Sequence, residues 1–255
     1  MIIRHDPVYD QYVRRHRARS PYAKCLYVLM HLIPGILAYL GLYVFRETLA
    51  SLGLSYRAIS LLVLLTVALG WELLGTLAML RYVERLSFRE SLRFLGFNRI
   101  DLKGNLILVP VVCVVFTLVS IPFMKWLYPH LRLFLDSIPA FHMGEWHIYH
   151  IGYYSFGWPV LLLVVVANFV GEEVYFRGYL LKKIDALPVP WLVSSLLFQA
   201  YHLWQVPINW PFMLLAPLIP FSLLMMWRKN IYSPILFHVF TNLVWGELTW
   251  LIARV

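Results

Sequence analysis

Long apolar runs are the feature that most restricts how this chain can fold. A helix of about 20 apolar residues crosses the hydrocarbon core of a bilayer, and its backbone groups are satisfied internally. The apolar runs cover roughly residues 26–46, 58–80, 105–127, 158–180, 190–206, 211–227 and 231–252. The sequence therefore predicts an all-α, polytopic transmembrane helix bundle of about seven spans, of which the fifth and sixth are short.

The composition excludes several other classes of protein. The residues are 61% hydrophobic and 14% charged, against about 45–50% and about 25% in soluble domains. A disordered chain, a disulfide-stapled module and a nucleic-acid-binding domain are excluded. The net charge of +9 is therefore interpreted as that of a membrane protein with basic cytoplasmic loops. We expect the protein to contact the lipid bilayer and not nucleic acid.

The basic residues predict the orientation of the chain. If the N-terminus is cytoplasmic, the inner segments hold 16 of the 22 Lys and Arg residues, as the positive-inside rule requires. These segments are 1–25, 81–104, 181–190 and 228–230. The absence of an Asn-x-Ser/Thr sequon favours a prokaryotic source or a protein with little lumenal exposure, and we expect a prokaryotic cell (inner) membrane.

The chain divides into two parts within one integral membrane domain. Residues 1–157 hold N-terminal membrane helices, a cytoplasmic amphipathic segment and an outer loop over 128–157. Within 81–104, arginines recur every four residues, which predicts an amphipathic helix on the membrane surface. They are Arg81, Arg85, Arg89 and Arg93. Residues 158–255 hold the remaining helices and most of the buried polar residues.

Polar residues inside predicted spans are the candidates for function. An ionisable side chain at the centre of a span costs about 2.5–3.5 kcal/mol, so such residues are rarely retained without a role. Here they concentrate in the last third of the chain, in three local patterns. These patterns contain Glu172, Glu173 and Arg177; Phe198 and His202; and His238 and Asn242.

Helix geometry separates the two carboxylates. At about 100° per residue, Glu173 and Arg177 lie about 40° apart and can form an ion pair. Glu172 is about 140° from Arg177 and shares its face with Asn168, Tyr175 and Tyr179. Glu173 is therefore interpreted as structural, and Glu172 as the free carboxylate.

This set of residues is suited to hydrolysis of an amide or ester. A carboxylate can take a proton from water, an imidazole can orient that water, and Asn with His can donate to a developing oxyanion. Two His and a Glu are also typical zinc ligands, so a metal site is an alternative. A polar network that only holds helices together is another.

The three patterns together resemble the CAAX protease and bacteriocin-processing (CPBP/Abi) family of intramembrane glutamic endopeptidases. The motifs Glu-Glu-x-x-x-Arg, Phe-x-x-x-His and His-x-x-x-Asn occur in the family's order over about residues 158–250. The resemblance implies that Glu172 and His202 activate a water, and that His238 and Asn242 form an oxyanion hole. It implies that Glu173, Arg177 and Phe198 support the site, and that residues 158–255 are the catalytic core.

The resemblance also implies a fold and a substrate class. Well-known members have eight helices, against seven counted here. We expect an endopeptidase acting on a membrane-associated peptide or protein, without a cofactor, with zinc dependence as an alternative. A non-catalytic membrane scaffold and a small transporter are further alternatives. Outside the motifs, Glu72 and His31 are expected to form a structural contact.

Overall fold

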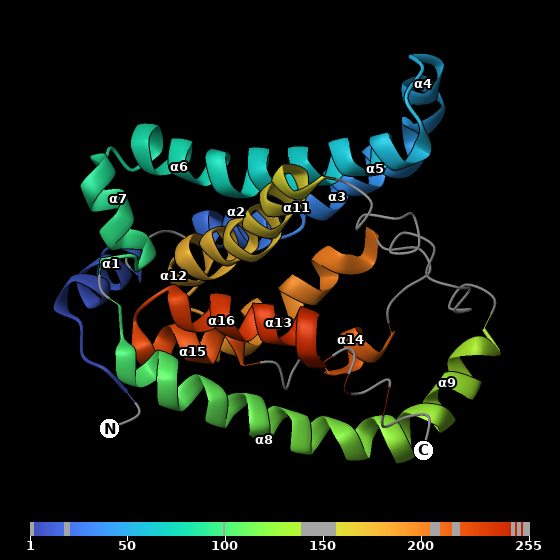
Figure 1. Ribbon diagram of the computed structural model, residues 1–255. Coiled ribbons are helices and arrows are strands. Elements are labelled where there is room, and N and C mark those ends of the chain that lie inside the picture. The colour runs from blue at the N-terminus through green and yellow to red at the C-terminus, as the bar shows by residue number, and fades with distance from the viewer. Residues whose placement is uncertain are drawn as a thin grey trace.

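The structure is a computed structural model that describes most of the chain. The described residues are 3–17, 21–98, 100–138, 157–204, 210–215, 220–245, 248 and 251. Every regular element within these ranges is a helix, which confirms the predicted all-α class (Figure 1).

Four described helices are long and apolar enough to cross a membrane. They are Tyr22–Val44, Tyr56–Val83, Gly104–Leu135 and Trp158–Lys183. They coincide with the first four predicted spans. The third extends beyond its predicted end at residue 127, so the first part of the predicted outer loop is helical. The rest of that loop, residues 139–156, lies outside the described residues.

Each long helix is a succession of α-helical and π-helical segments. The first contains α2 (Pro21–Met30), α3 (Ile33–Tyr39) and η1 (Leu40–Val44). The second contains α5 (Tyr56–Leu65), η2 (Thr66–Gly75), α6 (Thr76–Ala78) and η3 (Met79–Val83). The third contains η4 (Gly104–Leu108), α8 (Val109–Pro122), η5 (Phe123–Leu127) and α9 (Tyr128–Asp136). The fourth contains α11 (Trp158–Val165), η8 (Val166–Gly171), η9 (Glu173–Leu180) and α12 (Leu181–Lys183).

The last three predicted spans correspond to shorter helices within the described residues. The predicted span 190–206 contains α13 (Pro190–Tyr201) and the tighter 3₁₀ turn η10 (His202–Trp204). The span 211–227 is divided between α14 (Trp210–Leu215) and α15 (Phe221–Arg228), and 231–252 contains α16 (Tyr232–Phe240) and η12 (Thr241–Trp245). The total of seven spans, the eighth helix and the side of the N-terminus therefore stay predictions.

The amphipathic segment is shorter than expected and does not align all four arginines. The second long helix ends at Val83, and Arg85 has a positive φ of 57°, which interrupts helical geometry. A new helix, α7 (Phe88–Leu95), begins at Ser87 with a capping box to Glu90 and ends at Gly96. It buries Phe94 and Leu95 and leaves Arg89 and Arg93 exposed.

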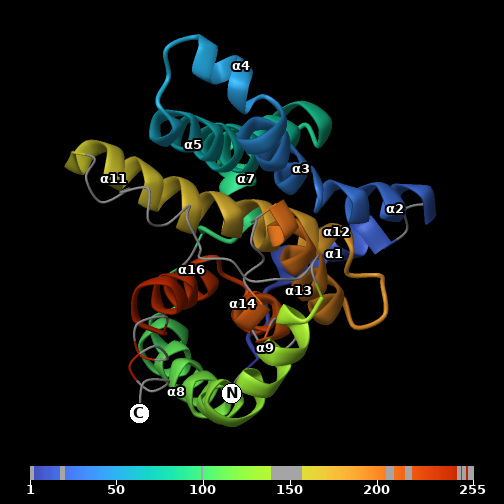
Figure 2. The same ribbon diagram turned by 90° about the vertical axis from the view of Figure 1, so that its right-hand side faces the viewer.

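The fourth long helix lies at the centre of the molecule. Figures 1 and 2 show it between the second long helix on one side and α13, α15 and α16 on the other, with α8 beyond α16. The short α1 (Pro7–Arg17) packs near its α12 end, and α4 (Arg46–Ser51) projects at the far side. Residues 171–184 are all buried, so this helix forms the core around which the others pack.

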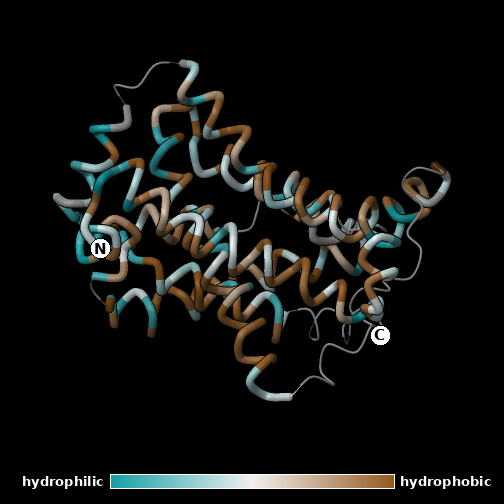
Figure 3. The backbone as a smooth tube through the Cα atoms, turned by 90° about the horizontal axis from the view of Figure 1, so that it is seen from above, coloured by the Kyte–Doolittle hydropathy of each residue, from teal (hydrophilic) through white to brown (hydrophobic). Residues whose placement is uncertain are grey.

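The outer surfaces of the long helices are apolar. Along α8, exposed side chains include Val111, Val114, Val115, Leu118 and Val119. Figure 3 shows hydrophobic residues along the long helices and more hydrophilic ones near the N-terminal end. Apolar surfaces of this extent indicate contact with lipid.

Candidate active site

Two glycines let the helices approach closely enough to form the site. A Cβ at Gly171 would lie 2.5 Å from the carbonyl oxygen of Ala68, which brings η8 against η2. A Cβ at Gly35 would overlap the carbonyl of Tyr201, which brings α3 against the end of α13. Small residues at such crossings are typical of packed membrane helices.

Glu172 is buried at the junction of η8 and η9, and its two oxygens have different surroundings. Oε1 accepts a hydrogen bond of 2.9 Å from Nδ2 of Asn168 and one of 3.4 Å from the hydroxyl of Tyr201. Oε2 has no hydrogen-bond partner among the described residues, and lies 4.0 Å from Nε2 of His238. One oxygen is thus held, while the other remains available.

Glu173 pairs with Arg177 as the helix geometry predicts. An Arg177 guanidinium nitrogen lies 3.1 Å from Oε1 of Glu173, and both side chains are fully buried. The same Oε1 lies 3.0 Å from Nδ1 of His238, a contact between η9 and α16. Glu173 therefore connects the first motif to the third.

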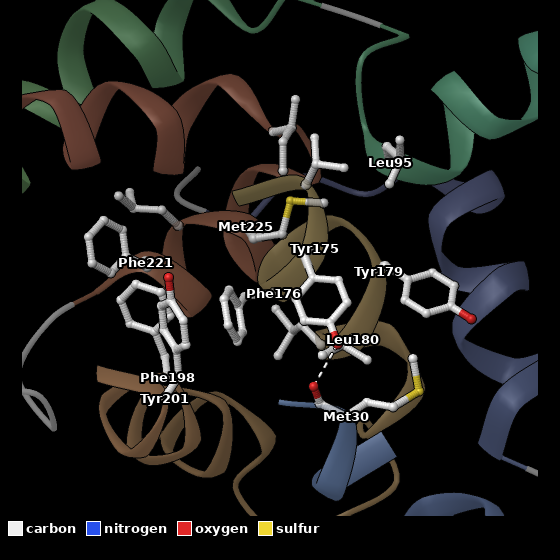
Figure 4. Close-up of a cluster of buried hydrophobic side chains, with 14 of the residues drawn as sticks. Met30, Leu95, Tyr175, Phe176, Tyr179, Leu180, Phe198, Tyr201, Phe221 and Met225 are labelled. Carbon is white, nitrogen blue, oxygen red and sulfur yellow. Dashed lines mark hydrogen bonds between the residues drawn. The ribbon is translucent and has the colours of Figure 1, made fainter. Parts of the chain in front are cut away.

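The Arg177 guanidinium is also enclosed by aromatic rings. Its Cζ atom lies 3.8 Å from the ring centroid of Phe198 and 4.4 Å from that of Phe221. Such cation–π contacts gain strength when water is excluded. Figure 4 shows Phe198 and Phe221 close to Phe176 and Tyr201 in this cluster. Phe198 thus supports the ion pair and connects the second motif to the first.

His202 joins the site at the end of α13. Its Nδ1 lies 2.8 Å from the carbonyl oxygen of Phe198, so Nδ1 carries the proton and donates. In the neutral imidazole, Nε2 is then an acceptor. The ring packs 4.7 Å from Phe198 and 4.4 Å from Tyr201, measured between centroids.

Asn242 is connected to Glu172 by hydrogen bonds through Asn168. Its Nδ2 donates to Oδ1 of Asn168 at 3.2 Å, and Asn168 in turn donates to Glu172. Asn242 is exposed, whereas Glu172, Glu173 and His238 are buried. The structure thus brings the residues of all three motifs into one neighbourhood; their chemical roles stay predictions.

Two contributors were not assigned to the site from the sequence. Asn168 was placed on the face of Glu172 but given no role, and Tyr201 lies inside the second pattern beside His202.

Glu72 was expected to contact His31. Instead, His31 bonds the carbonyl oxygen of Tyr27 through Nδ1, and neither Nε2 of His31 nor either oxygen of Glu72 has a hydrogen-bond partner among the described residues.

Two residues expected on the face of Glu172 point elsewhere. The Tyr175 hydroxyl donates to the carbonyl oxygen of Met30 at 2.6 Å (Figure 4), and the Tyr179 ring packs against Phe94. Their partners lie on the first long helix and on α7, so the neighbouring helices determine where these two side chains lie.

A metal site is not formed by the described residues as they stand. Within the ranges described, no three His, Cys, Asp or Glu side chains are placed to hold a metal ion. Glu172 and His238 are neighbours, but His238 directs Nδ1 to Glu173.

The four apolar helices and the buried cluster of carboxylates and imidazoles define an integral membrane protein with a polar site inside its helix bundle. Residues 154–244 match the family model of type II CAAX prenyl endopeptidase Rce1-like proteins. The match supports the CAAX protease family assignment that the three motifs predict, and with it a peptidase of the membrane. No curated protein and no solved structure shows significant similarity to the chain.

Proposed function

We propose that the protein is an intramembrane endopeptidase in which a water activated by Glu172 hydrolyses a membrane-associated peptide or protein substrate. The observation that carries this proposal is the asymmetry of the Glu172 carboxylate. Asn168 and Tyr201 hold Oε1, and Oε2 has no partner among the described residues. An immobilised carboxylate with one available oxygen is suited to accept a proton from water.

The two histidines are suited to different tasks. His202 donates from Nδ1 to a carbonyl, so its Nε2 can accept from the water and help to orient it. His238 donates from Nδ1 to the Glu173 carboxylate, so its Nε2 donates only when the ring is an imidazolium. As an imidazolium, His238 would donate from Nε2 to the developing oxyanion while Nδ1 stays bonded to Glu173.

The reaction follows from these positions. Glu172 Oε2 takes a proton from the water while the water oxygen attacks the scissile carbonyl carbon. The resulting oxyanion accepts hydrogen bonds from Nε2 of His238 and from the amide of Asn242. The protonated Glu172 then delivers its proton to the leaving amine as the C–N bond breaks. No cofactor takes part in this proposal, and the setting we propose is a prokaryotic cell membrane.

The test is cleavage of lipidated and membrane-anchored peptides by the purified protein in liposomes. We expect Glu172→Gln to abolish cleavage while the variant remains folded and inserted, and a strong chelator to leave wild-type activity unchanged. Glu47→Gln is the matched control, because the Glu47 side chain is 90% exposed on α4. Wild-type turnover by Glu172→Gln would reject the proposal, and inhibition by the chelator would favour zinc. A cellular phenotype that tolerates Glu172→Gln would favour a scaffold.

A further inference from the structure

Glu72 is a buried carboxyl group for which the proposed reaction has no use. It lies in η2 of the second long helix and is 0% exposed. The segment η2 packs on η8, at the crossing where Gly171 meets Ala68. A Cβ at Gly171 would also lie 3.8 Å from Cβ of Leu73, so Glu72 and Glu172, the neighbours of Leu73 and Gly171 in the chain, lie near each other although 100 residues separate them.

The hydroxyl of Tyr201 lies near both carboxyl groups. It is within hydrogen-bond distance of Oε1 of Glu172, at 3.4 Å, and close to the Glu72 carboxyl group, whose oxygens accept no hydrogen bond from the described residues. A phenol has one proton, so it can donate to only one of the two groups at a time. Donation to Glu172 is favoured when Glu72 offers a proton to the phenol oxygen instead of competing for the phenol's own proton.

The charges around Glu72 indicate which form it takes. Three carboxyl groups, Glu72, Glu172 and Glu173, are buried together. Arg177 contacts Glu173, and His238 lies between Glu173 and Glu172. Glu72 contacts neither cation, and a buried carboxylate without a cationic partner is strongly unfavourable. Of the three, Glu72 is the group that gains most from being the neutral acid.

We propose that Glu72 is a positioning residue: as a neutral acid it donates to the Tyr201 hydroxyl, which then donates to Oε1 of Glu172. The chain of two hydrogen bonds fixes the Glu172 carboxylate so that Oε2 faces the water. No proton is transferred between these groups in this arrangement. The proposal rests on the proposed function, because its consequence is the geometry of the Glu172 base.

The kinetic test compares two substitutions that differ in hydrogen bonding. Glu72→Gln keeps a donor at the same place, and we expect kcat within about threefold of wild type. Glu72→Leu removes the donor, and we expect kcat to fall about 10- to 100-fold with KM nearly unchanged. Equal losses in both variants, or a wild-type kcat in Glu72→Leu, would overturn the proposal.

The route through Tyr201 is tested by a double-mutant cycle. Tyr201→Phe removes the intermediate hydroxyl, so Glu72→Leu added to it should cause less than about a further twofold loss of kcat. Multiplying losses would mean that Glu72 does not act through Tyr201. If Glu72→Leu does not fold, the cycle is run with Glu72→Met, which also lacks a donor and is unbranched.

A spectroscopic readout separates this inference from the proposed function. The infrared difference between wild type and Glu72→Gln should contain the carbonyl stretch of a protonated carboxylic acid at neutral pH, and its absence would overturn the inference. If wild type cleaves substrate and Glu172→Gln does not, a missing band rejects the role of Glu72 alone. If wild type cleaves no substrate, the proposed function fails and the catalytic role of Glu72 fails with it, whether or not the band is present.

Discussion

The Nδ1 atom of His238 lies 3.0 Å from Oε1 of Glu173, and this contact joins the first and last motifs of the chain. It decides the tautomer of His238, because a carboxylate paired with arginine accepts and does not donate. Glu173 is thus more than the partner of Arg177: it also determines what the other nitrogen of His238 can do.

Replacement of Glu173 by Gln should lower activity by disturbing His238. The Gln amide can donate to Nδ1, so the hydrogen bond that fixes which ring nitrogen of His238 donates is lost. By analogy with the loss of an orienting carboxylate beside a catalytic histidine, we expect kcat to fall by about 10²-fold or more, with a small change in KM. Steady-state kinetics checks this, and an unchanged kcat would show that the contact is only structural.

Asn242→Ala should impair catalysis and leave stability intact. Loss of one oxyanion donor costs about 10²- to 10³-fold in kcat, whereas Asn242 is exposed and contributes little to packing. Leu243→Ala, at the exposed neighbouring position, is the control and should retain activity. Equal effects of the two substitutions on kcat would argue against a specific role for the amide.

Gly171→Ala should separate the second and fourth long helices. The added Cβ would lie 2.5 Å from the carbonyl oxygen of Ala68, a contact with backbone that cannot move aside. Overpacking of this kind costs about 1–3 kcal/mol. Gly70→Ala is the matched control, because its Cβ would meet no atom within 4 Å. Unfolding measurements in mixed micelles should show a lower free energy of unfolding for Gly171→Ala and not for Gly70→Ala. Equal stability of the two variants would contradict the close contact between η2 and η8.

Asp101 should make the stability of the protein sensitive to acid. It lies before the third long helix, and the hydrogen bond from the Arg228 guanidinium lowers the pKa of its carboxyl below the ordinary 3.8. The folded state therefore holds this proton less tightly than the unfolded state. The resulting stabilisation is complete above the ordinary pKa and is lost as the pH falls through the lowered value.

The corresponding variant is Asp101→Asn. Because Arg228 is buried, loss of its partner should cost about 3–5 kcal/mol at neutral pH, and the difference from wild type should shrink below about pH 4. In contrast, Glu47→Gln removes an exposed pair with Arg46, at 3.9 Å, and should change stability by less than about 1 kcal/mol. A gap between wild type and Asp101→Asn that persists at low pH would contradict the assignment.

The sequence predicts the helical class and the first four spans because apolar length is a local property. The pair Glu173–Arg177 is predictable for the same reason, since both residues lie on one helical turn. The contact of His238 with Glu173 and the proximity of Glu72 to Glu172 depend on which helices become neighbours, and spacing along the chain does not contain that information. The directions of Tyr175 and Tyr179 depend on neighbouring helices too, because their partners are Met30 on the first long helix and Phe94 on α7.

The complete burial of residues 171–184 has a consequence for how a substrate can arrive. A helix covered on every side offers no path along its own surface, so a peptide bond cannot reach Glu172 by following the fourth long helix. Asn242 is exposed and is linked to Glu172 by way of Asn168, so under the proposed function a substrate would enter on the η12 flank of the bundle. A substrate anchored in the same bilayer would then approach sideways, by diffusion in the plane of the lipid.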